Sequence, residues 1–197
     1  MIDHKGRVIA TIGSLEEDEA GNVIQQMSQN MQVQAIFLRE VLDKAIEKYR
    51  LDETKILEYL FQSPAFEDSK KELLRLGLRS YLNKDNITAI HLLIPQIEDS
   101  FRRVLELCGG VILKQTRDGD GFQYKTLDEI LRDERLYQVF GENSMLYFRV
   151  VLTDRKGWNI RNEVAHGLLP QDRFNFHISD RLIHILLCLA AVREEKD

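Results

Sequence analysis

The chain has 197 residues, a formal net charge of −5 and an apolar fraction of 44%, which are values of an ordinary globular protein with one domain and room for an extension. A protein that coats nucleic acid is basic, so the net charge of −5 excludes that class. A nucleic-acid-binding protein with this net charge needs a local patch of positive charge. No apolar run reaches the roughly 20 residues that cross a bilayer. The N-terminus lacks the pattern of a signal peptide, so we expect a cytoplasmic protein with no membrane contact.

The first half of the chain is predicted to be helical after a short β-branched run at residues 7–12. Four helices are expected because apolar residues recur there at helical spacing. They cover residues 22–49, 52–61, 68–82 and 86–108, with Asp52 and Asn86 as the expected N-caps of the second and fourth helices. In the fourth helix, Pro95 should cause a kink, and Gly109 and Gly110 should end it.

The second half begins with a predicted β-hairpin, formed by residues 111–116 and 122–125 around the turn residues Asp118 to Gly121. Helices are then expected over residues 127–132, 134–140, 144–153, 159–166 and 178–193. The predicted fold class is mainly α. It consists of an N-terminal arm and helical extension (1–85) and a helical domain (86–197) that carries an insertion at about 109–141.

One segment, residues 154–167, combines residue types that are chemically coherent. Five basic residues stand against three acidic ones between residues 149 and 173, so positive charge is local here. On a helix, Asn162 and His166 share a face, and the long side chain of Arg161 can reach round to it. Arginine matches phosphate oxygens, and histidine moves protons near neutral pH. This set predicts phosphoryl transfer on RNA, where the 2′-hydroxyl is the attacking group.

A structural interpretation of the same residues remains open, and spacing alone favours it. In that interpretation Arg161 pairs with a carboxylate such as Glu98, and His166 binds a helix end beside Gly167. His177 and His184 are interpreted as core or surface histidines. The sequence contains no Walker loop, no dinucleotide fingerprint and no zinc motif, so neither a metal nor a cofactor is expected.

The pattern Arg161-Asn162-x-x-x-His166-Gly167 resembles the R-N-x-x-x-H-G signature of a family of domains of unknown function within the HEPN superfamily, which is defined by an R-x4–6-H motif. The helix from His91 to Arg102 resembles the helix that precedes the motif in that family. Asp154, Gly157 and Asn159 resemble its lead-in. The similarity covers about residues 86–192 and places residues 1–84 only weakly.

The resemblance implies a HEPN-like helical bundle that pairs with itself and binds RNA. Many such domains are metal-independent endoribonucleases of toxin, antiphage or RNA-processing systems, which implies an antitoxin or a larger parent protein as a further partner. A polar residue after the arginine, here Asn162, is typical of members that cleave. Other members serve only in binding or dimerisation.

The predicted site therefore has His166 as general base or acid and Arg161 holding the phosphate, with Asn162 orienting His166 or donating to phosphate. Supporting roles are predicted for six further residues. Arg155 and Lys156 are interpreted as contacts to the RNA backbone or as solvated loop charges. Glu98 is expected to hold Arg161 from the facing helix, which also contains Arg102, and Asp154 and Asn159 are expected to fix the lead-in turn.

The predicted assembly follows from the chemistry of transesterification. One group must take a proton from the 2′-hydroxyl, and another must deliver a proton to the leaving oxygen. One motif supplies one histidine, so a C2 homodimer with both His166 side chains in a shared groove would complete the set. Its interface is expected from the apolar faces of helices 159–166 and 178–193. Two alternatives remain: a silent helical dimerisation module, and a domain that binds a nucleotide without cutting a chain.

Overall fold

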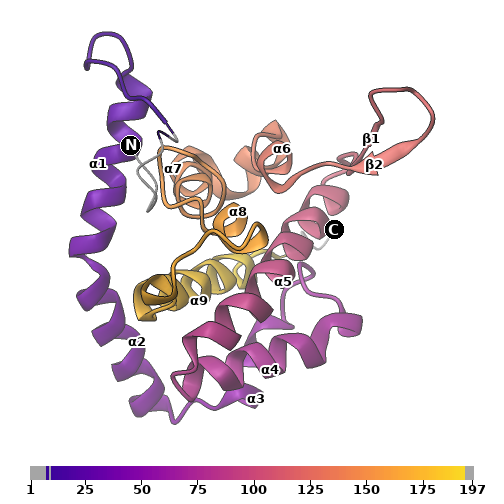
Figure 1. Ribbon diagram of the computed structural model, residues 1–197. Helices are drawn as coiled ribbons and strands as arrows, with labels where there is room; N and C mark the ends of the chain where they lie inside the picture. The colour runs from indigo at the N-terminus through magenta and orange to yellow at the C-terminus, as the bar shows by residue number, and fades with distance from the viewer. Residues whose placement is uncertain (1–7, 9, 194–197) are drawn as a thin grey trace.

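The computed structural model describes residue 8 and residues 10–193 (Figure 1). The chain is mainly α-helical, with nine α-helices, two short 3-10 helices and one two-stranded hairpin among these residues. The run predicted at residues 7–12 lies largely outside the described part. None of the described helices is long and apolar enough to cross a membrane.

The helix predicted from residue 22 to residue 49 is two helices, α1 (Glu19–Val33) and α2 (Ala35–Tyr49). Helix α1 begins three residues earlier than predicted because the Asp18 side chain accepts a hydrogen bond from the Gly21 amide at 3.0 Å. Only Gln34 separates the helices, and its amide still bonds Asn30 O at 2.9 Å. The two helices follow one another as a bent rod along one edge of the molecule (Figure 1).

The next helices agree with the predicted segments. They are α3 (Glu53–Leu60), the 3-10 helix η1 (Asp68–Lys70), α4 (Lys71–Leu82) and α5 (Asn86–Leu107). Asp52 caps α3 through the Lys55 amide, as expected. Asp85, and not Asn86, caps α5 through the Thr88 amide. Helix α5 continues through Pro95.

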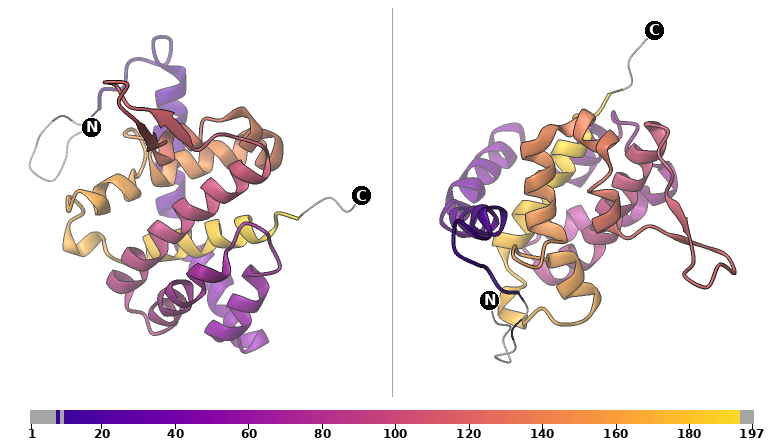
Figure 2. Two further views of the ribbon diagram at one scale, coloured as in Figure 1. Left: turned by 90° about the vertical axis from the view of Figure 1, so that its right-hand side faces the viewer. Right: turned by 90° about the horizontal axis from the view of Figure 1, so that it is seen from above.

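The predicted insertion contains a short antiparallel hairpin. Strand β1 (Leu113–Gln115) pairs with β2 (Phe122–Tyr124), with Lys114 opposite Gln123. The hairpin projects from the body (Figure 2). Helix α6 (Leu127–Ile130) follows, and then α7 (Glu134–Leu152), inside which Gly141 has a φ of +76°. That conformation breaks the helix where the sequence predicted two pieces.

The last elements are α8 (Ile160–Ala165), the 3-10 helix η2 (Gln171–Arg173) and α9 (Phe176–Ala190). Helix α9 runs through the middle of the molecule (Figures 1 and 2) and packs against α2, α3 and α5. One hydrophobic core contains residues from both sides of the predicted boundary at 85/86. That boundary is the turn between α4 and α5, which pack along each other, and it does not separate two cores.

Most of the apolar residues of α9 are buried within the single chain. Ile178, Leu182, Ile185, Leu186 and Leu189 are at most 1% exposed in the single chain. These residues belong to the chain's own hydrophobic core, whereas Leu187 and Cys188 of the same helix are only partly buried.

Candidate functional site

The lead-in to the motif is a tight turn between α7 and α8. Asp154 organises it, because its carboxylate accepts from the Lys156 amide at 2.9 Å and its carbonyl accepts from the Gly157 amide at 2.9 Å. The Trp158 amide then donates to Val150 O at 2.7 Å, which ties the start of the motif to the end of α7. The predicted part of Asp154 in shaping this turn agrees with these contacts.

Gly157 permits a close approach of the turn to α7. A Cβ at this position would lie 2.3 Å from the carbonyl oxygen of Val150. Gly157→Ala is therefore expected to lower the free energy of unfolding by about 1–3 kcal/mol, because the backbone of the turn must move. Urea unfolding measures this change. Gly121→Ala, at a position with nothing within 4 Å of a Cβ, is the control, and equal losses for the two variants would contradict this account.

Helix α8 begins at a residue in an uncommon conformation. Asn159 has a φ of +51°, which asparagine tolerates better than most residues. Its side-chain oxygen accepts from the Asn162 amide group at 2.7 Å. Its own amide group lies 3.5 Å from a Glu163 oxygen. Asn159 thus holds the side chains of the first turn of α8 in fixed positions.

The Arg161 guanidinium is held by a buried carboxylate on α5. Its Nε donates to Glu98 Oε2 at 2.8 Å and its Nη2 to Glu98 Oε1 at 3.3 Å. Its Nη1 donates to the Asn162 side-chain oxygen at 3.2 Å. Arg102 also donates to Glu98, which is only 7% exposed. The contact that the structural interpretation predicted between Arg161 and Glu98 is therefore present.

His166 lies at the opposite end of α8 and is exposed. Its amide donates to Asn162 O at 3.0 Å, and Gly167 follows with a φ of +64°, so the helix ends directly after His166. The imidazole lines a surface hollow together with Arg155, Asn162 and Glu163, and Asn159 and Leu168 complete its wall.

Arg161 lines a different hollow. Its walls come from α5 and α8 and include Glu98, Arg102, Val164 and His91. The prediction that Arg161 and His166 flank a single phosphate is thus not matched within one chain, because the two residues line different hollows. Asn162 connects the two sides, since it accepts from Arg161 and lines the His166 hollow.

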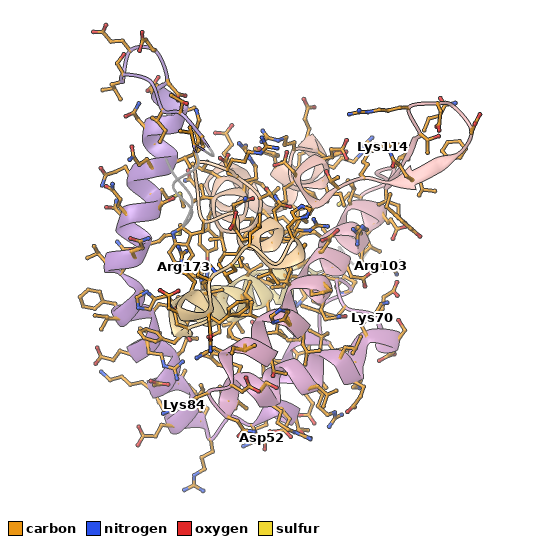
Figure 3. The ribbon with its side chains drawn as sticks, in the orientation of Figure 1. Asp52, Lys70, Lys84, Arg103, Lys114 and Arg173 are labelled. Atoms are coloured by element: carbon orange, nitrogen blue, oxygen red, sulfur yellow. The ribbon has the colours of Figure 1, made fainter. Side chains whose placement is uncertain are left out.

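Most of the local positive charge is already paired. Lys156 forms an ion pair with Asp18 at the beginning of α1. Arg149 bonds the Tyr137 hydroxyl at 3.1 Å. Arg155 is the basic side chain that lines the His166 hollow and is exposed. Arg173 lies elsewhere, close to the beginning of α9 and apart from Arg103 and Lys114 on the hairpin side (Figure 3).

Glu163 is the residue of this site that the sequence interpretation missed. It stands three residues before His166, and positions three apart are neighbours on a helix surface. Its carboxylate and the imidazole of His166 line the same hollow. The sequence signal that could have identified Glu163 is its position within the motif, three residues before His166.

Other candidate residues lie outside this site. His184 is half-buried with its Nδ1 at 2.9 Å from the Tyr147 hydroxyl, and burial lowers the pKa of its imidazole. His177 is half-buried near the start of α9. Asp118 and Asp120 lie in the turn of the hairpin. The described part of the chain contains no group of three His, Cys, Asp or Glu side chains placed to hold a metal ion.

Comparison of the chain with protein-family models, with curated proteins and with solved structures found no match.

Proposed function

We propose that this chain is an endoribonuclease of the HEPN type that cleaves RNA by attack of a 2′-hydroxyl on the neighbouring phosphate. The observation that carries the proposal is the surface hollow that the exposed His166 lines together with Arg155, Asn162 and Glu163. These are the side-chain types that this reaction needs, and they come from one turn and one helix.

Each group has a place in the reaction. His166 and Glu163 form the proton-transfer pair: one takes the proton of the 2′-hydroxyl and the other delivers a proton to the leaving 5′-oxygen. Arg155 and the Asn162 amide donate hydrogen bonds to the phosphate oxygens, on which negative charge develops. The bond from phosphorus to the 5′-oxygen breaks as the bond to the 2′-oxygen forms, which leaves a 2′,3′-cyclic phosphate.

Arg161 acts in this proposal as a positioning residue. Two of its nitrogens bind Glu98 and the third binds Asn162, so it fixes the Asn162 side chain and holds α8 against α5. The planar fork of a guanidinium suits this task, because three bonds in different directions come from one rigid group. The side chains that donate hydrogen bonds to the phosphate are therefore those of Arg155 and Asn162.

Cleavage is expected to persist in excess EDTA and to leave a 2′,3′-cyclic phosphate or its 3′-phosphate hydrolysis product. The physical reason is that side chains supply both the proton transfers and the charge stabilisation. The measurement is incubation of the purified chain with mixed RNA in chelator, followed by analysis of the product ends. A parallel preparation of His166→Ala controls for contaminating nucleases.

Two results would contradict the proposed chemistry. Strict dependence on magnesium, or products with a 5′-phosphate, would indicate metal-directed attack by water. Binding of a mononucleotide with no cleavage of any RNA would favour the alternative of a nucleotide-binding module.

A further inference from the structure

The hollow that Arg161 lines, called the Arg161 hollow below, lies between α5 and α8. Helix α8 lies beside α5 in Figure 1, and the ion pair between Arg161 and Glu98 joins the two helices. The hollow has a volume of about 430 Å³, which is within the range of sites that hold small molecules. The proposed function uses Arg161 only to position Asn162, so the hollow itself has no assigned occupant.

The charged groups of the Arg161 hollow offer more hydrogen-bond donors than acceptors. They are the guanidinium groups of Arg161 and Arg102 and the carboxylate of Glu98. Both Glu98 oxygens already accept from arginine, Oε2 from Arg161 and Oε1 from Arg161 and Arg102. A guanidinium has five N–H bonds, and the described bonds of Arg161 use one on each nitrogen. One N–H therefore remains on Nη1 and one on Nη2, and the hollow has an excess of positive charge.

The rest of the wall is largely apolar. Helix α5 contributes Ile94 and Pro95, and helix α8 contributes Val164 and Ala165. The imidazole of His91 completes the wall and stacks on a neighbouring ring, that of Phe174, with 5.1 Å between the ring centroids. Apolar walls suit the faces of a flat ring, and guanidinium donors suit an edge that carries acceptors. The ligand that fits this hollow is therefore a planar group with acceptors along one edge.

The position of the hollow connects it with an RNA substrate. Asn162 lines the His166 hollow, and its side-chain oxygen accepts from Arg161 Nη1 at 3.2 Å. A single side chain thus stands between the proposed phosphate site and the donors of Arg161. Proteins read unpaired RNA by turning bases out of the strand and binding their edges. A base next to the cut is therefore a planar group that is already tethered beside the Arg161 hollow.

We propose that the Arg161 hollow binds a guanine base of the RNA, on one of the two nucleotides that flank the cut. This inference rests on the proposed function and adds a sequence preference to it. Guanine carries two neighbouring acceptors, O6 and N7, which match the two remaining N–H groups of Arg161. Adenine and cytosine present an amino donor there, and uracil presents one acceptor. Each of these bases would leave a donor of the hollow unpaired.

Oligonucleotides with a single 2′-hydroxyl test the preference. Every other ribose is 2′-O-methylated, and each of the four bases is placed in turn on either side of the cut. Guanine at one of the two positions should raise kcat/KM about ten- to a hundredfold over the other bases, which is the discrimination of one bidentate arginine contact. Equal cleavage of the whole set would overturn the inference and leave the proposed function intact.

Modified bases identify the edge that is read. The base 7-deazaguanine lacks the N7 acceptor and should lose most of the preference. Hypoxanthine keeps O6 and N7 and lacks only the amino group of guanine, so its oligonucleotide should be cleaved like the guanine one. The reverse result, a loss with hypoxanthine and none with 7-deazaguanine, would overturn the proposed contact with Arg161.

Ala165→Phe places a large side chain in the hollow with little effect on folding, because Ala165 is exposed. The ratio of cleavage rates for guanine and uracil substrates should fall toward one, whatever happens to the absolute rate. Ala191→Phe is the matched control, since Ala191 is also exposed at a helix end and does not line the hollow. The control should keep the wild-type ratio. An unchanged ratio in Ala165→Phe would contradict the inference.

Binding without cleavage separates this inference from the proposed function. Fully 2′-O-methylated RNA has no attacking hydroxyl, and fluorescence anisotropy measures its affinity for the wild-type chain. RNA with guanine should bind about tenfold or more tightly than RNA with uracil, and Ala165→Phe should remove the difference. This result with no cleavage of any RNA would keep the guanine site and overturn the proposed function. Equal binding of the two RNAs would overturn the guanine site.

Discussion

His166→Ala is expected to lower the rate of RNA cleavage at least about a hundredfold, which is the scale for loss of a general acid or base. The free energy of unfolding should change by less than about 0.5 kcal/mol, because His166 is exposed and its backbone bonds are kept. Cleavage rates with a defined oligonucleotide and urea unfolding of the same preparations measure both effects.

His177→Ala is the control for this variant, since His177 lines a hollow formed with Trp158 and Arg173 and takes no part in the reaction. It should retain the wild-type rate. A folded His166→Ala chain with undiminished activity would remove His166 from the mechanism. Glu163→Gln should also lose activity, because it removes the second proton-transfer group from the His166 hollow.

Arg161→Ala is expected to affect both cleavage and stability. Cleavage should fall about a hundredfold, because Asn162 loses one of the two side-chain hydrogen bonds that fix it and α8 loses its ion pair with α5. The free energy of unfolding should fall by about 1–3 kcal/mol, because the buried Glu98 carboxylate loses two hydrogen bonds and keeps only Arg102 as a charged partner.

A double variant separates the two effects of Arg161. Glu98→Ala added to Arg161→Ala removes the carboxylate that the single change leaves poorly paired, so part of the lost stability should return. Cleavage should stay low, because Asn162 still lacks the hydrogen bond from Arg161 and is held by Asn159 alone. Recovery of both stability and activity in the double variant would show that Arg161 acts only through Glu98 and not through Asn162.

Local structure was predictable where the residues that determine it are close in sequence. Asp52 caps α3, Gly141 breaks α7 at a positive φ, and residues 111–125 form the hairpin, each from signals within a few positions. The single helix predicted over residues 22–49 was nearly right, since its only error besides the start is the interruption at Gln34.

The surroundings of each helix were not predictable in the same way. Periodicity shows that α2 and α9 have apolar residues, but it cannot show which neighbour covers them. Most of helix α9 is buried by elements from distant parts of the chain. Val33, Ile36, Phe37 and Val41 on α1 and α2 are equally apolar, and the described chain leaves them exposed. Tertiary packing decides which face of a helix is covered and which face is left exposed.

The candidate site shows the same division. The motif predicted which residues of α8 stand together, and the contact between Arg161 and Glu98, 63 positions apart, was also expected. The sequence did not predict that the Arg161 guanidinium would donate its hydrogen bonds to both Glu98 and Asn162. Arg155 is therefore the exposed cation that lines the hollow with His166. That result required the position of α5 relative to α8.

The most direct test of the central claim is cleavage of an oligonucleotide that carries a single 2′-hydroxyl, with every other ribose 2′-O-methylated. The account predicts one cut, directly 3′ of the unmodified nucleotide, by the wild-type chain in EDTA and no cut by His166→Ala. Cleavage at methylated positions would contradict it, because the attacking group would then be something other than the 2′-hydroxyl.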